Sequence, residues 1–161
     1  MSTVLIAGGG SGGHLMPALA IATELRARGR RVVLVGATRG IESRLLPHRG
    51  FRYHLLQSEP IYRRQWWKNL RWPLLAIRLL RQIDRVFKEE TPGLVVGTGG
   101  YAAGPVVWRA ARRRIPTAIL EQDAFPGLAT RLLAREAKHV YLGQPETRAR
   151  LTIGLDTQVF V

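Results

Sequence analysis

The fold is indicated most clearly by residues 4–17, which read Val4-Leu5-Ile6-Ala7-Gly8-Gly9-Gly10-Ser11-Gly12-Gly13-His14-Leu15-Met16-Pro17. The first four residues of this stretch form an apolar run that predicts a buried strand, and residues 17–28 predict a helix with Pro17 in its first turn. Five of the seven residues at positions 8–14 are glycine, so backbone amides there can approach an anion closely. The helix N-terminus adds partial positive charge, which predicts phosphate binding; the competing interpretation is a tight turn capped by His14.

Strands and helices are expected to alternate along the rest of the chain. Further strands are predicted at residues 31–36, 51–57, 94–96, 117–120 and 139–142, with a weak one at 158–161. Helices are predicted at residues 42–48, 73–90, 105–113 and 128–136. Because the strands are continuously apolar, we expect one α/β domain over residues 1–161, with a Rossmann-like parallel sheet and helices on both faces.

Three loops are expected to share one crevice, because ligands of such sheets bind at the carboxyl ends of the strands. The second loop, residues 97–105, repeats the glycine cluster and includes Gly100 and Tyr101, whose phenol could bond or stack. The third, residues 121–127, carries Glu121, Gln122 and Asp123. Carboxylates there suit sugar hydroxyls or base catalysis, although Asp123 could instead cap the following helix.

The net charge is the most unusual feature of the composition. Twenty-five basic residues against 11 acidic ones give a net charge of +14, which favours a polyanionic partner or an Arg-rich solvated surface. Cysteine is absent, so disulfides and thiolate metal sites are excluded. We expect no signal peptide, because the apolar start is too short, and no membrane span.

A basic aromatic segment follows the third strand. Its tryptophans are Trp66, Trp67 and Trp72, and its basic residues are Arg63, Arg64, Lys68 and Arg71. Trp66 and Trp67 are predicted to share one face with Leu70 and Leu74. Tryptophan–arginine mixtures favour the headgroup region of a bilayer, and each basic residue adds about 1 kcal/mol of attraction to an anionic leaflet. This segment predicts peripheral membrane association; the alternative is a core helix with a solvated basic face.

Two other ligand classes fit less well. The first glycine loop formally matches a dinucleotide fingerprint, but the second strand ends without a carboxylate for a ribose. Arg39 could meet a 2′-phosphate, which leaves NADP open. Nucleic acid could stack on the tryptophans, but the chain carries no nucleic-acid-binding motif, so no such partner is expected.

Taken in order, the loop motifs resemble the N-terminal half of the MurG family in the GT-B class of glycosyltransferases. The motifs are 10–14 with Pro17, 99–101 with 104–105, and 121–122 with Gly127, and the similarity covers essentially the whole chain. The resemblance implies inverting transfer of N-acetylglucosamine from UDP-N-acetylglucosamine to an undecaprenyl-diphosphate-linked muramyl peptide. It also implies work at the cytoplasmic face of the bacterial plasma membrane, without a metal or other cofactor.

Site residues follow from the resemblance position by position. Ser11, with Gly12 and Gly13, matches the first family loop, where threonine is usual, and the swap keeps the hydroxyl. His14 matches a family histidine and is a candidate catalytic base or acceptor-positioning group. Tyr101 matches a position on the acceptor side.

The third loop matches the family less closely. Glu121 matches an acceptor-side position, and Gln122 belongs to the same motif. Asp123 stands where the family has asparagine at a donor-sugar contact, and its charge beside phosphates is unfavourable unless paired. Leu120 replaces a usual histidine.

The family's second domain, which holds most of the UDP-sugar, is expected to be absent. The chain ends about where the family crosses to that domain, so we expect an acceptor half that is inactive alone. It could be an isolated domain of a transferase, one subunit of a split UDP-sugar transferase, or a non-catalytic module that binds lipid diphosphates.

Overall fold

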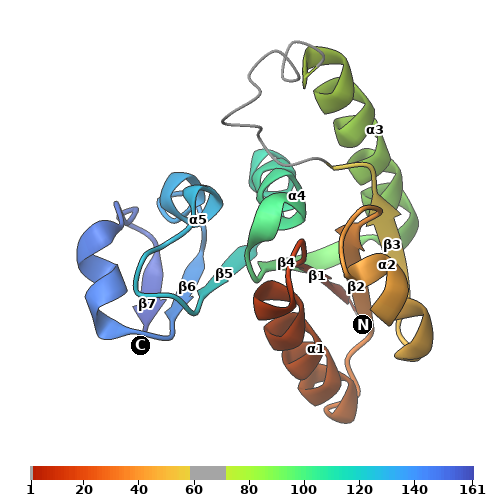
Figure 1. The fold of residues 1–161 in the computed structure, drawn as a ribbon. Coiled ribbons are helices and arrows are strands. Elements are labelled where there is room, and N and C mark those ends of the chain that lie inside the picture. The colour runs from red at the N-terminus through yellow and green to blue at the C-terminus, as the bar shows by residue number, and fades with distance from the viewer. Residues whose placement is uncertain (1, 59–71) are drawn as a thin grey trace.

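Seven parallel strands form the centre of the structure, a computed structural model that describes residues 2–58 and 72–161 (Figure 1). The strands are β1 (Thr3–Ala7), β2 (Val32–Ala37), β3 (Arg52–Leu56), β4 (Pro92–Gly97), β5 (Thr117–Glu121), β6 (His139–Leu142) and β7 (Gln158–Phe160). Their order in the sheet is β3-β2-β1-β4-β5-β6-β7, and every neighbouring pair is parallel. The predicted parallel α/β architecture is confirmed, and the weak last strand is present.

Helices cover both faces of this sheet (Figure 1). They are α1 (Gly12–Ala27), α2 (Glu42–Leu45), α3 (Trp72–Glu90), α4 (Gly100–Arg112) and α5 (Leu128–Leu133), with 3-10 turns η1 (Leu46–His48) and η3 (Pro145–Arg150). Along β1, Leu5 packs in the cluster formed with α3, α4 and α5, whereas Ile6 packs in the cluster formed with α1. Both side chains are fully buried, which explains why the strands read as continuously apolar.

Two helices begin earlier than the sequence predicts. Helix α1 starts at Gly12 and α4 at Gly100, so both glycine clusters contribute to the first helical turn. Pro17 and Pro105 therefore lie inside their helices, and the prediction that they occupy the first turn is wrong. Proline cannot donate the usual bond to the carbonyl four residues earlier. At Pro17 this leaves the Gly13 carbonyl unused by the helix, and the Gln122 amide donates to it over 3.2 Å.

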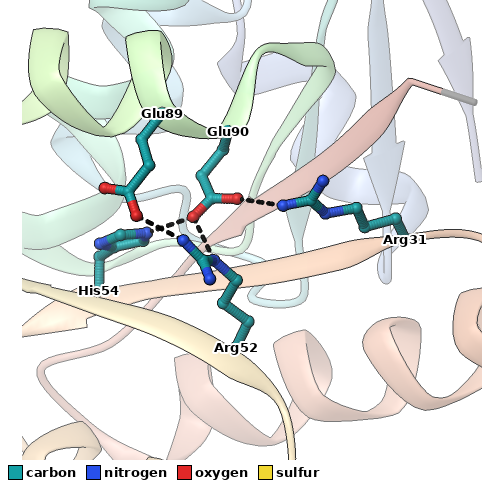
Figure 2. Close-up of polar contacts among 5 residues, drawn as sticks. All are labelled: Arg31, Arg52, His54, Glu89 and Glu90. Atoms are coloured by element: carbon teal, nitrogen blue, oxygen red, sulfur yellow. Dashed lines mark hydrogen bonds and ion pairs between the residues drawn. The ribbon is translucent and has the colours of Figure 1, made fainter.

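An ion-pair network lies near the amino ends of β2, β3 and β4, and Figure 2 shows its five side chains. Glu90, the last residue of α3, is fully buried and accepts bonds from Arg31, Arg52 and His54, which lie beside or on β2 and β3. Neighbouring Glu89 also pairs with Arg52. The network ties α3 to the edge of the sheet.

Most of the predicted membrane segment lies outside the described residues. This applies to Arg63, Arg64, Trp66, Trp67, Lys68, Leu70 and Arg71. Trp72 is the first residue of α3. Within the described residues, no helix is long and apolar enough to cross a bilayer.

Candidate functional site

The first two glycine loops meet where the strand order changes direction, between β1 and β4. The Thr98 amide donates to the Ala7 carbonyl over 2.9 Å, and the Gly9 amide contacts the Gly99 carbonyl at 3.4 Å. Gly100 has φ +84°, and a Cβ there would overlap the Gly9 carbonyl. The two loops therefore interlock through the backbone. This is the crevice position expected for a doubly wound sheet.

His14 joins all three predicted loops. It sits in the first turn of α1, half-buried, and its Nδ1 lies 3.2 Å from the Thr98 carbonyl and 2.9 Å from Gln122 Nε2. Thr98 is fully buried and also donates its hydroxyl to the His14 carbonyl over 2.8 Å. The prediction that the three loops come together is confirmed, and His14 packs against the other two loops instead of capping its own.

The two contacts at Nδ1 of His14 favour opposite tautomers. If Nδ1 is unprotonated, the Gln122 amide donates to it, and Nε2 carries a proton that suits a phosphate oxygen. If Nδ1 carries the proton and donates to the Thr98 carbonyl, the lone pair of Nε2 can accept a proton from a hydroxyl. In either case Nδ1 is held by protein groups, so Nε2 is the nitrogen available for a ligand.

Gly12 and Gly13 border open space. A Cβ on Gly12 would meet nothing within 4 Å, and one on Gly13 would meet only the Ser11 hydroxyl, at 3.8 Å. Neither glycine has a positive φ, so neither packing nor backbone conformation explains the missing side chain. Ser11 is the exposed N-cap of α1, and its side chain makes no capping bond. The first amides of this 16-residue helix thus have no side-chain cap, an arrangement that suits an anion.

The third loop is braced by Glu121. This residue is 4% exposed, and its two oxygens accept bonds from the amides of Asp123, at 3.2 Å, and Gly127, at 3.1 Å. The carboxylate therefore shapes the loop, and its contact with a ligand stays a prediction. Asp123 is exposed, and the N-cap of α5 is Gly127, so the alternative that Asp123 caps this helix is wrong.

Tyr101 lies over the first loop. It is half-buried in the first turn of α4, and a Cβ on Gly10 would come within 2.5 Å of its ring. The ring thus covers the backbone just before Ser11. The predicted acceptor-side position of Tyr101 is compatible with this placement.

Sequence reasoning missed one residue of the site, Glu42. It opens the short helix α2 yet is fully buried, and its Oε1 accepts the amide of Gly10 from the first loop. In the sequence, Glu42 resembles a solvent-exposed glutamate in the first turn of a helix. Its burial depends on glycines distant in the sequence, so no local pattern signals it.

One group could in principle hold a metal ion. Ligand atoms of His54, Glu89 and Glu90 lie within 4.8 Å of one another. However, Arg31 and Arg52 already pair with Glu90, and their positive charges oppose a cation. Among the described residues, this group is better explained as the ion-pair network that links α3 to the sheet (Figure 2).

These features define the class of the protein. A 3-2-1-4-5-6-7 parallel sheet with two interlocked glycine loops at the β1/β4 switch point and an uncapped helix N-terminus is an α/β domain of GT-B type. Residues 4–142 match the glycosyltransferase family 28 N-terminal domain, and the chain belongs to this family.

Two relatives at more than 40% identity are N-acetylglucosamine transferases. The UDP-N-acetylglucosamine–N-acetylmuramyl-(pentapeptide) pyrophosphoryl-undecaprenol N-acetylglucosamine transferase of Carboxydothermus hydrogenoformans is 42% identical over 150 residues, which cover 92% of this chain and 40% of the relative. The Myxococcus xanthus protein of that name is 43% identical, with 92% and 39% covered. The chain therefore spans about two fifths of these relatives' length.

Solved structures agree with this assignment. The crystal structure of Acinetobacter baumannii MurG superposes with a TM-score of 0.81 at 28% identity, covering 99% of this chain and 46% of that one. The Streptomyces glycosyltransferase SsfS6 reaches a TM-score of 0.61 at 14% identity, covering 88% and 50%, which shows a shared fold.

Proposed function

We propose that this chain is the acceptor half of an inverting N-acetylglucosaminyltransferase of peptidoglycan synthesis. It binds the diphosphate of an undecaprenyl-diphosphate-linked muramyl peptide. The sugar hydroxyl of that acceptor attacks the anomeric carbon of UDP-N-acetylglucosamine, gives its proton to a base and displaces UDP. The relatives' names supply the substrates, and the uncapped N-terminus of α1 supports a diphosphate site in this chain. A separate C-terminal domain holds most of the UDP-sugar.

The open surroundings of Gly12 and Gly13 carry this proposal. Glycine near a helix start costs stability relative to alanine, so its presence at two positions without steric neighbours calls for another reason. Close approach of a phosphate to the amides supplies that reason. His14 Nε2 lies on the same turn, where it can contact the diphosphate or take the proton of the attacking hydroxyl.

Gly13→Ala separates this function from folding. The backbone at Gly13 is compatible with alanine, so the free energy of unfolding should rise by about 0.4–1 kcal/mol. The added methyl stands between the amides and a phosphate, so affinity for a soluble diphosphate-bearing muramyl-peptide analogue should fall at least about tenfold, or about 1.4 kcal/mol. Urea unfolding and calorimetry measure the two effects.

Gly127→Ala is the matched control. Gly127 also stands at a helix start, as the N-cap of α5, and a Cβ there would meet nothing within 4 Å. Its substitution should leave diphosphate affinity within about twofold, a change near 0.4 kcal/mol. If Gly13→Ala binds the analogue as tightly as the wild type, the first turn of α1 is not the diphosphate site.

We also propose that the chain works at the cytoplasmic face of the bacterial plasma membrane, bound to an anionic surface. Helix α3 follows the tryptophan-rich segment in the sequence and exposes Leu74 (66%) and Ile77 (48%) near its start. Arg78 and Arg81 are exposed further along the same helix. Apolar side chains beside basic ones suit the headgroup region of a bilayer.

Replacing Leu74 and Ile77 by serine should weaken binding to vesicles containing anionic lipid by about tenfold, because two inserted side chains are lost. Trp66→Ala with Trp67→Ala should have a similar effect. Leu155→Ser is the matched control, since Leu155 is fully exposed in a different part of the chain. Vesicle cosedimentation measures the partition; unchanged binding of both double variants would remove the membrane proposal.

The alternative is a non-catalytic module that binds lipid diphosphates, or the acceptor subunit of a split transferase. The placement of His14 favours a catalytic half, because a simple diphosphate cradle does not require an imidazole fixed at Nδ1 by two other loops. Transfer by a fusion of this chain with a donor-binding domain would exclude the non-catalytic module.

A further inference from the structure

A buried carboxylate stands directly behind the first glycine loop. Glu42 is fully buried, its Oε1 accepts the Gly10 amide, and its Oε2 has no hydrogen-bond partner. Burying a carboxyl group with one oxygen left without a hydrogen bond costs free energy, so stability alone does not explain the residue.

Three glycines form a socket for this side chain. A Cβ on Gly9, Gly36 or Gly40 would overlap the Glu42 side chain. These glycines come from the first loop, from the end of β2 and from the turn before α2. Three separate segments are thus shaped around one carboxyl group.

The bond to Gly10 sets the direction of the loop peptide. It turns the amide between Gly9 and Gly10 into the protein, toward Oε1 of Glu42. The Gly9 carbonyl lies against Gly100 of the second loop. The next residues are Ser11, the exposed N-cap of α1, and Gly12, the first residue of that helix.

We propose that Glu42 is the positioning residue of the diphosphate loop. Its hydrogen bond holds the peptide between Gly9 and Gly10 in the one orientation that presents the following amides to the ligand. The side chain acts from behind the loop and does not touch the acceptor. This inference rests on the proposed function for its ligand, but the loop geometry can be tested without one.

Two substitutions separate the hydrogen bond from the charge. Glu42→Gln keeps a carbonyl oxygen at the position of Oε1 and removes the negative charge behind an anion site. Glu42→Ala removes both and leaves the Gly10 amide without its acceptor. A positioning role predicts that glutamine rescues what alanine loses.

The first measurement is amide NMR of residues 10–13 in wild type, Glu42→Gln and Glu42→Ala, with no ligand present. We expect the Gly12 and Gly13 resonances to stay near their wild-type positions in the glutamine variant and to shift or broaden in the alanine variant. Unchanged resonances in Glu42→Ala would overturn the inference. If the alanine variant does not fold, a glutamine variant whose Gly12 and Gly13 resonances differ from the wild type would overturn it as well.

The second measurement is calorimetry with the diphosphate-bearing muramyl-peptide analogue. We expect Glu42→Gln to bind at least as tightly as the wild type, and Glu42→Ala to bind at least about tenfold more weakly. Equal affinity of wild type and alanine variant would contradict the positioning role. Failure of the wild type to bind would count against the proposed function, whereas the ligand-free resonances would still decide the role of Glu42.

Discussion

Glu90→Ala is expected to lower the free energy of unfolding by about 3 kcal/mol, because it removes a buried carboxylate that accepts charged hydrogen bonds from several partners. Arg31 pairs with it at 2.9 Å and His54 at 2.7 Å, and Arg52 adds a third contact. Without Glu90 the guanidinium groups of Arg31 and Arg52 are left close together, and α3 loses its polar contacts with this edge of the sheet. Urea unfolding at neutral pH measures the loss.

A matched control is Glu24→Ala on α1. Glu24 pairs with Arg28 at 2.7 Å, but both side chains are mostly exposed. Such a pair contributes about 0.3–0.5 kcal/mol, so its removal should have a small effect. Equal losses in the two variants would mean that the network of Figure 2 does not hold the sheet edge.

The same network makes stability depend on pH. Burial raises the pKa of Glu90, but bonds from His54 and Arg52 outweigh it and hold the pKa below its ordinary value of 4.5. Between the two values the unfolded chain binds more protons, so the stabilisation is present above about pH 4.5 and is lost as pH falls through the folded pKa. In Glu90→Gln this part of the acid destabilisation should be missing.

The sequence predicts the sheet well because each strand is a continuous apolar run that can be recognised locally. Runs such as residues 4–7 are buried on both faces, and burial on both faces requires continuous apolar residues. The position of the loops then follows from topology, since the carboxyl ends of parallel strands share one edge.

The helix starts could not be predicted in the same way. Glycine has low helix propensity, so the segments around Gly12 and Gly100 resemble loops. In the structure, contacts between distant segments override that preference, including the bond from Thr98 to the His14 carbonyl and the bond from Gln122 to the Gly13 carbonyl.

Glu42 shows the other limit of sequence reasoning. Its neighbours along the chain suggest a solvated helix start, and only the fold brings Gly9 and Gly36 around its carboxyl group. The sequence predicts Gln122 at the site, but it does not predict the contact of Gln122 with His14, which spans 108 positions. Positioning roles of this kind depend on tertiary contacts, which local patterns do not encode.

The proposed catalytic role of His14 predicts the second large effect. Its Nδ1 is held by Thr98 and Gln122, which leaves Nε2 to act on the acceptor. Loss of a positioned general base or acid typically costs about 10²–10⁴ in rate. We therefore expect His14→Ala to lower the rate of transfer by at least about 100-fold, with the fold intact. His48→Ala, at an exposed histidine of η1, should leave the rate unchanged.

The most direct test of the acceptor-half proposal joins residues 1–161 to the C-terminal half of Acinetobacter baumannii MurG, whose crystal structure resembles this chain with a TM-score of 0.81. Transfer of labelled N-acetylglucosamine from UDP-N-acetylglucosamine to a lipid-linked muramyl-peptide acceptor is then measured. We expect the wild-type fusion to transfer N-acetylglucosamine. The His14→Ala fusion should lose this activity, and the His48→Ala fusion should keep it. A folded fusion that binds both substrates without transfer, or a His14→Ala fusion as fast as the wild type, would contradict the proposal.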